Sequence, residues 1–257
     1  MLGFGLSIEP ALWTLIFTMV RVGAAFIAAP VFSAVSVPVT VRITLAGAIG
    51  ILAMNSNAII APEQVFAFET FLSIAAEALV GLALGFILQI AFAAPLLASE
   101  VIGTSMGIGF AAAINPQSGT STPALGNFLS ILLTLLFLAV DGHLVLVELV
   151  VRSYEVLPPG AAWLSVAALR NIAFFGGYAF LAGFLLALPV GFLLLCLNLI
   201  VGMLSRSSPS LNLFAVGLPA SLLAGVIALF VAMPAMGDYM LVIIHEALEA
   251  ARTLVLG

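Results

Sequence analysis

Six ionisable side chains lie inside long apolar stretches of this sequence. Charge is costly in such surroundings, so these residues are the first candidates for a functional role. They are Arg21, Glu77, Glu100, Asp141, His143 and Glu148. Such groups can form a proton or ion relay, as in transporters, with His143 able to change charge near neutral pH. They can instead pair with one another and fix contacts between helices. Asp141 and His143 are two positions apart and do not share a helix face. We therefore favour the second interpretation, and we expect assembly roles for Arg21, Arg42, Glu77, Asp141 and His143.

The stretch from Gly103 to Gly107 matches the G-x-S-x-G pattern in which serine hydrolases hold their nucleophile, here Ser105. That pattern works only on a strand-turn-helix elbow that exposes the serine, and the sequence predicts no convincing strand. The two histidines are far apart and lack companion ligands at a metal-binding spacing. The single cysteine, Cys196, excludes an intramolecular disulfide and is expected to be a small apolar core residue. We expect no catalytic centre, no metal and no cofactor.

The least ordinary segment runs from 103 to 123, where glycines, prolines and polar side chains interrupt an otherwise apolar chain. Irregular backbone at membrane depth is tolerated only when it is buried in protein or lines a water-filled cavity. A pore-lining or re-entrant loop is one interpretation, with Met106, Ile108, Phe110 and Ile114 forming an apolar constriction. An ordinary surface loop is the other. Composition alone leaves both open.

The elements that must position these residues are long apolar helices. Of the 257 residues, 64% are hydrophobic and only 7% are charged, with a formal net charge of −5 and no lysine. Soluble domains are about 45–50% apolar and about 25% charged, so most of this chain faces lipid or other apolar helices. Nucleic-acid binding is not expected, because the chain has no lysine and no run of basic residues to neutralise phosphates.

Six stretches are long enough to cross a bilayer, which needs about 20 apolar residues. They cover residues 11–29, 43–61, 71–98, 124–147, 172–204 and 211–233. The fifth is so long that we expect Pro189 and Gly191 to break or kink it. Loops are predicted at 30–38, 62–64, 158–160 and 205–210. After the sixth, charged residues from Asp238 to Arg252 alternate with apolar ones and predict an amphipathic C-terminal helix. The arginines outside the spans divide three to two between the two sides, which sets no orientation.

Several stretches resemble, in order, the FliR family of flagellar export proteins and its injectisome counterparts of the SctT type. They are RVGAAFIAAPVFS from Arg21, VPVTVR from Val37, GIGFAAAINPQSG from Gly107, LAVDGHL from Leu138, SYEVLP from Ser153 and LNLFAVGLP from Leu211. The resemblance implies an all-α, polytopic membrane-type protein of about six long apolar helices with Pro/Gly breaks. It also implies a single export-gate domain over residues 1–257.

The same resemblance implies a structural and gating role, without catalysis, in type III protein export at the flagellar basal body in the bacterial inner membrane. Residues 1–148 would be FliP-like, 149–171 a connector, and 172–257 a FliQ-like hairpin followed by the C-terminal helix. The chain would join FliP-like and FliQ-like subunits, and contact FlhB-like and FlhA-like components, lipid and unfolded export substrates.

A plug loop at about 103–123 would close the channel. Its residues would be Met106, Gly107, Ile108, Gly109, Phe110, Ile114, Asn115, Pro116 and Gly119, with Phe110 in the closed pore. The family often has Asp where this chain has Asn115. The alternative function is a secondary transporter or channel that uses buried Glu77, Asp141 and His143.

Overall fold

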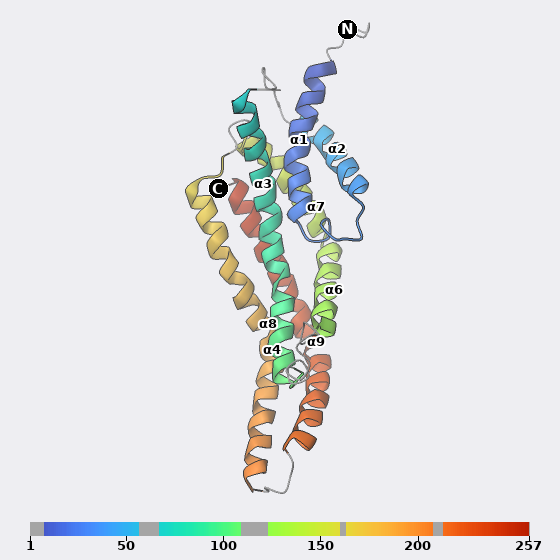
Figure 1. The fold of residues 1–257 in the computed structure, drawn as a ribbon, viewed down its shortest axis with the longest axis vertical. Coiled ribbons are helices and arrows are strands. Elements are labelled where there is room, and N and C mark those ends of the chain that lie inside the picture. Colours follow the sequence, from blue (N-terminus) through green and yellow to red (C-terminus); the bar gives the residue numbers. More distant parts are fainter. Residues whose placement is uncertain (1–7, 57–66, 109–122, 160–162, 208–212, 257) are drawn as a thin grey trace. The chain divides into compact units, whose positions relative to one another are not determined.

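The computed structural model describes residues 8–56, 67–108, 123–159, 163–207 and 213–256, and these residues form α-helices and no strand. The helices are α1 (Ile8–Ala28), α2 (Val39–Ser56), α3 (Phe68–Phe92), α4 (Ala94–Ser105), α6 (Pro123–Ala139), α7 (Gly142–Val156), α8 (Val166–Ser207) and α9 (Leu213–Leu256), labelled in Figure 1. The predicted all-α fold is confirmed. Five helices are long and apolar enough to cross a membrane, or six if α6 and α7 count as one bent span. The chain is a multi-span membrane protein.

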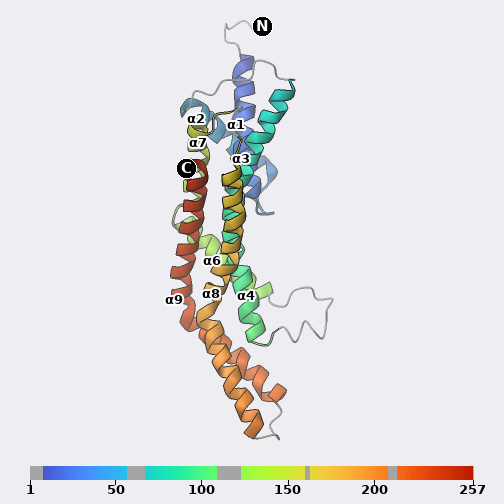
Figure 2. The same ribbon diagram turned by 90° about the vertical axis from the view of Figure 1, so that its left-hand side faces the viewer.

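The chain divides into two compact units. The first comprises Met1–Ile90, Leu138–Gly176 and Ile244–Gly257, and the second comprises Ala91–Phe137 and Gly177–Ile243. Within the first unit, α1 packs against α2, and both contact α7. Within the second, residues 177–207 of α8 and 213–243 of α9 lie side by side as a hairpin, as both Figure 1 and Figure 2 show.

Glycines allow α1 and α3 to approach closely in the first unit. A Cβ atom on Gly81 would overlap the carbonyl oxygen of Arg21 and lie 2.9 Å from the Cβ of Ala24, and one on Gly85 would lie 2.7 Å from the Cβ of Ala28. Contacts advance in the same direction along both helices, so α1 and α3 run parallel. Small residues four apart are the usual means by which membrane helices bring their backbones together.

The second unit uses the same principle between α4 and its neighbours. A Cβ on Gly183 of α8 would lie 2.6 Å from the Cβ of Leu97, and one on Gly126 of α6 would lie 2.9 Å from the Oγ of Ser99. Phe92 and Phe137 stack edge to face with ring centroids 5.5 Å apart. The glycine contacts hold α4 against α6 and α8, and the ring contact joins the end of α3 to α6. The last three residues of α4, 103–105, already belong to the predicted plug segment.

Three details of the predicted elements were wrong, and a fourth was wrong in part. The span at 124–147 is two helices, α6 and α7, bent by 64°, because Asp141 has a left-handed backbone (φ 56°) that no α-helix continues through. The predicted break at Pro189 is contradicted, because α8 continues through that residue, since long apolar helices packed against neighbours tolerate proline; the alternative, a kink, stays a prediction. The C-terminal amphipathic segment is not a separate helix but the end of α9, which runs through both Pro219 and Pro234. Cys196 is exposed on α8 rather than buried in the core.

The loop predictions had mixed outcomes. The loop predicted at 30–38 is confirmed, since α1 ends at Ala28 and α2 begins at Val39. Helix α7 ends at Val156, ahead of the prolines predicted to break it, but α8 extends to Ser207 into the loop predicted at 205–210. The loop predicted at 62–64 and most of the segment at 103–123 lie outside the described residues.

Candidate functional site: a buried arginine cluster and the end of helix α4

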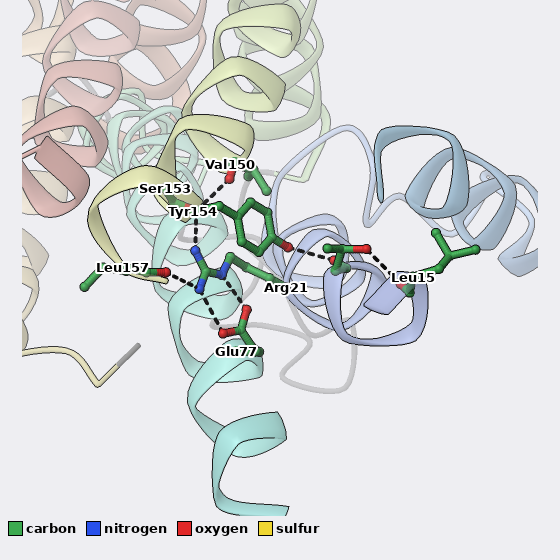
Figure 3. A network of polar contacts seen from close by, with 8 residues as sticks. Leu15, Arg21, Glu77, Val150, Ser153, Tyr154 and Leu157 are labelled. Atoms are coloured by element: carbon green, nitrogen blue, oxygen red, sulfur yellow. Dashed lines mark hydrogen bonds and ion pairs between the residues drawn. The ribbon is translucent and has the colours of Figure 1, made fainter. Parts of the chain in front are cut away.

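The first unit buries a charged pair between α1 and α3. Arg21 donates from Nε to Oε2 of Glu77 at 2.7 Å and from Nη2 to Oε1 at 2.9 Å, and both side chains are 0% exposed. Figure 3 shows the two groups facing each other in this two-pronged arrangement. Paired donors of this kind match the planar guanidinium to the carboxylate. Glu77 and Gly81 are four residues apart on α3, so the glycine contact with α1 also brings the carboxylate to Arg21.

Residues of α7 complete the surroundings of Arg21. Its Nη1 donates to Ser153 Oγ at 2.8 Å, and its Nη2 donates to the carbonyl oxygen of Leu157 at 2.7 Å. The ring of Tyr154 lies 4.0 Å from the guanidinium carbon, a cation–π distance. The hydroxyl of Tyr154 in turn donates to the carbonyl of Thr18 at 2.8 Å (Figure 3). Arg21 therefore ties α1, α3 and the end of α7 together.

The cluster is built to hold helices. All three guanidinium nitrogens have partners, and arginine stays protonated in proteins. Both oxygens of Glu77 accept from Arg21, so a proton added to the carboxylate would displace one of these bonds. The geometry thus favours a structural ion pair over a proton relay. Sequence reasoning selected Arg21 and Glu77 but missed Ser153, Tyr154 and the Leu157 carbonyl, because a serine, a tyrosine and a backbone oxygen carry no unusual composition.

The other residues expected to serve assembly lie apart from this cluster. Arg42 donates to the carbonyl of Ala34 at 2.7 Å across the loop after α1. Asp141 is exposed and precedes α7 without a side-chain cap. The Nδ1 atom of His143 is buried and has no hydrogen-bond partner within the described part of the chain. Glu148 pairs with Arg152 on an exposed face of α7.

The predicted plug begins at the end of α4 in the second unit. Met106 is only 3% exposed, and Gly107 has a positive φ of 81°. Ser105 is in the last turn of α4, where its Oγ donates to the carbonyl of Val101 at 2.8 Å. This is a helical setting and not the elbow that a hydrolase nucleophile requires. Of the predicted plug residues, Gly109, Phe110, Ile114, Asn115, Pro116 and Gly119 lie outside the described residues.

No three His, Cys, Asp or Glu side chains gather as a metal site in the part of the chain that the structure describes. Two cavities lie in the first unit. One, of about 550 Å³, is lined by Ile87 of α3, the start of α8 and the end of α9. The other, of about 360 Å³, lies among α1, α3 and α8 and has an apolar lining. Neither is lined by a charged residue, although the larger one is lined in part by Ser165, Asn171 and Thr253.

Comparison with known proteins identifies the family. The family described as bacterial export proteins, family 1, matches residues 12–247. The flagellar biosynthetic protein FliR of Escherichia coli (strain K12) is 38% identical over 227 residues, covering 86% of this chain and 84% of that protein. FliR of Pectobacterium carotovorum is 36% identical over 84% of this chain and 82% of its own, and FliR of Bacillus subtilis (strain 168) is 31% identical over 83% of each. The chain belongs to the FliR family of bacterial flagellar export proteins.

Proposed function

We propose that this chain is a wall and gating subunit of the flagellar type III export gate, in complex with FliP-like and FliQ-like subunits in the bacterial inner membrane. The observation that carries this proposal is the apolar length of α8 and α9. Each contains a candidate membrane span of 39 residues, Val166–Leu204 and Gly217–Val255. The first carries one charged side chain, Arg170, and the second carries charge only from Asp238 onward. At about 1.5 Å per residue, each stretch measures about 58 Å along the helix.

A bilayer covers only part of that length. Its hydrocarbon core is about 30 Å thick, and even a tilt of about 40° would leave such a helix spanning about 45 Å. Residues 171–205 of α8 contain no charged side chain. Exposed apolar side chains occur along the whole of α8, among them Val166, Phe174, Phe184, Phe192, Leu199 and Met203.

The apolar surface beyond the bilayer must therefore be covered by protein. Within this chain, only 22% of an 18-residue apolar segment of α8 and 17% of one of α9 are buried, against 44% for Ala11–Ala28 of α1. Other subunits are the remaining source of cover. A secondary transporter that works as a single chain has no need for helices of this length with so little burial, so the hetero-oligomeric export gate is the better reading.

The proposed mechanism needs no catalysis. Unfolded export substrates pass through a channel whose wall includes this chain, and the segment at about 103–123 seals the channel at rest. Apolar side chains of that segment would exclude water and ions, with Phe110 in the pore, and its glycines would let the backbone move when substrate arrives. FlhB-like and FlhA-like components would deliver the substrates from the cytoplasm.

The native mass of the chain, purified in mild detergent after co-expression with FliP-like and FliQ-like subunits from the same genome, tests the assembly. We expect one large complex that contains all three. A monomer or homodimer that binds neither partner would refute the proposal and favour the transporter based on Glu77, Asp141 and His143.

The seal has a separate test. Deletion of residues 107–119 should leave the mass of the complex unchanged and make cells leak small solutes. A length-preserving variant, with Ile108, Phe110 and Ile114 replaced by serine, should leak as well. Unchanged permeability in a correctly assembled deletion variant would refute the plug assignment while leaving the assembly proposal in place.

A further inference from the structure

The C-terminal end of α4 is closed by a Schellman motif. Met106 N donates to the carbonyl of Ile102 at 2.9 Å, Gly107 N to that of Thr104 at 3.0 Å, and Ile108 N to that of Gly103 at 3.0 Å. The left-handed backbone of Gly107, with φ of 81°, makes this pattern possible. Three of the last four carbonyls of α4 are thereby satisfied within the turn itself.

The fourth carbonyl, that of Ser105, is satisfied from another helix. Asn198 of α8 donates to it from Nδ2 at 3.1 Å. The amide oxygen of Asn198 accepts a bond from Ser221 Oγ of α9 at 2.9 Å, which fixes the orientation of the amide group. A chain of two hydrogen bonds thus joins the end of α4 to both helices of the α8–α9 hairpin, all within the second unit.

The turns of α9 on either side of Ser221 also pack against the end of α4. A Cβ on Gly107 would lie 2.5 Å from Cδ2 of Leu218, and a Cβ on Gly225 would lie 2.6 Å from Cγ of Met106. Met106 is almost fully buried by this contact. Packing therefore holds the side chain of Met106, while Asn198 and Ser221 hold the backbone one residue earlier.

Asn198 stands between Leu197 and Leu199 in an otherwise apolar part of α8. Polar side chains in such surroundings are rare and mark contacts that water cannot supply. Asn198 and its bond to Ser105 are exposed within this chain. Where lipid or another apolar helix covers this face of α8, no water is at hand to replace the amide as a donor. Without the amide, the last turn of α4 would then lose one of its four closing bonds, and its end would fray.

We propose that Asn198 and Ser221 are positioning residues that fix the end of α4 and so set where the chain leaves that helix after Ile108. This inference rests on the proposed function, in which the following segment seals the channel. The pair acts through the backbone of α4 and does not itself touch a substrate. The Asn198 amide donates to a helix carbonyl that has no partner within its own helix, and the Ser221 hydroxyl orients that amide.

Hydrogen exchange of the purified full-length chain, in mild detergent with its co-purifying subunits, tests the inference. The amides of Met106, Gly107 and Ile108 report on the closing bonds. In Asn198→Leu and in Ser221→Ala we expect these amides to exchange about five- to tenfold faster, as for the loss of one hydrogen bond. Ser221→Thr, which keeps the hydroxyl, should behave like the wild type. The matched control is Asn171→Leu, the same change on the same helix but in the first unit.

Small-solute leakage in cells that carry the same variants is the second measurement. We expect Asn198→Leu and Ser221→Ala to leak and Asn171→Leu not to leak. Unchanged exchange at Met106–Ile108 in Asn198→Leu would overturn the inference, and faster exchange without leakage would overturn the positioning role. If deletion of 107–119 causes no leak while Asn198→Leu still speeds exchange, the plug proposal fails and the effect of Asn198 on α4 stands.

Discussion

The pair formed by Arg21 and Glu77 can be tested by removing its members singly and together. We choose methionine for both positions because it is unbranched, apolar and close in length to either side chain. Arg21→Met strands the Glu77 carboxylate, and Glu77→Met strands the Arg21 guanidinium, each at a site that is fully buried. Breaking one partner of a buried ion pair typically costs about 3–5 kcal/mol, because an uncompensated charge is left inside.

The double variant should cost much less than the sum of the two single ones. With both charges gone, Ser153 Oγ still donates to the carbonyl of Val150 at 2.6 Å. The carbonyl of Leu157 loses its donor, Arg21 Nη2, at a cost of about 1–3 kcal/mol. The singles together should then exceed the double by about 3 kcal/mol or more, the gap between two stranded charges and one stranded carbonyl.

The assay is the free energy of unfolding of the purified chain in detergent micelles, with helix content followed by circular dichroism. Arg152→Met, Glu148→Met and their double form a matched cycle on an exposed ion pair of α7, for which the coupling should be below about 1 kcal/mol. Additive effects at Arg21 and Glu77 would refute the argument from burial. A Glu77→Gln variant that unfolds normally but loses a pH-dependent transport activity would instead support a proton relay.

Three further outcomes follow from backbone geometry. Each is measured as unfolding of the chain in detergent, and the Asp141 variants are also assayed for protein secretion by cells. Gly81→Ala should destabilise by about 1–3 kcal/mol, since its Cβ would overlap the Arg21 carbonyl, whereas Gly23→Ala on α1, with open space around it, should be neutral or slightly stabilising; equal effects would contradict the close packing. Asp141→Gly and Asp141→Asn should fold and support secretion, whereas Asp141→Val should lower the free energy of unfolding by about 1–2 kcal/mol, because the backbone at this position requires φ of 56° and not a charged side chain. Loss of secretion in a well-folded Asp141→Asn would show that the carboxylate matters. Val31 has φ of 72° in a tight turn closed by Phe32 N and the Pro30 carbonyl, so Val31→Gly should stabilise by about 1 kcal/mol, while Val35→Gly in the same loop should not.

The sequence predicted the fold class because hydrophobicity over 20-residue windows is set by the solvent, which is lipid or other apolar helices. It also selected Arg21 and Glu77, since charge is conspicuous in an apolar span. It could not predict that the two form an ion pair, because they are 56 positions apart and other acidic residues within apolar stretches could equally have paired with Arg21. One signal would have helped. Small residues follow Arg21 at Ala24, Ala25 and Ala28, and follow Glu77 at Gly81 and Gly85. If these two sets of small residues pack against each other, the two charged residues that precede them lie side by side.

Helix boundaries were less predictable, for reasons that differ from place to place. The Asp-Gly dipeptide at 141–142 is a turn signal, but the apolar residues around it masked the bend between α6 and α7. Of the break or kink expected at Pro189, the break does not occur and α8 continues through that residue, because packing against neighbouring helices can satisfy the freed backbone groups. The end of α4 was predicted as a loop from the glycines of the 103–123 segment; of the two that the structure describes, Gly103 lies within the helix and Gly107 has the positive φ that ends it.

The two polar clusters share one physical cause. A helix that ends in apolar surroundings leaves carbonyl oxygens that water cannot reach, so the protein must supply donors from other helices. Arg21 of α1 does this for Leu157 at the end of α7, and Asn198 of α8 does it for Ser105 at the end of α4. Both ends precede a connecting segment, so each donor also fixes where the chain departs. In this largely apolar chain, Arg21 and Asn198 therefore mark two helix ends at which the direction of the following backbone is fixed by a donor from another helix.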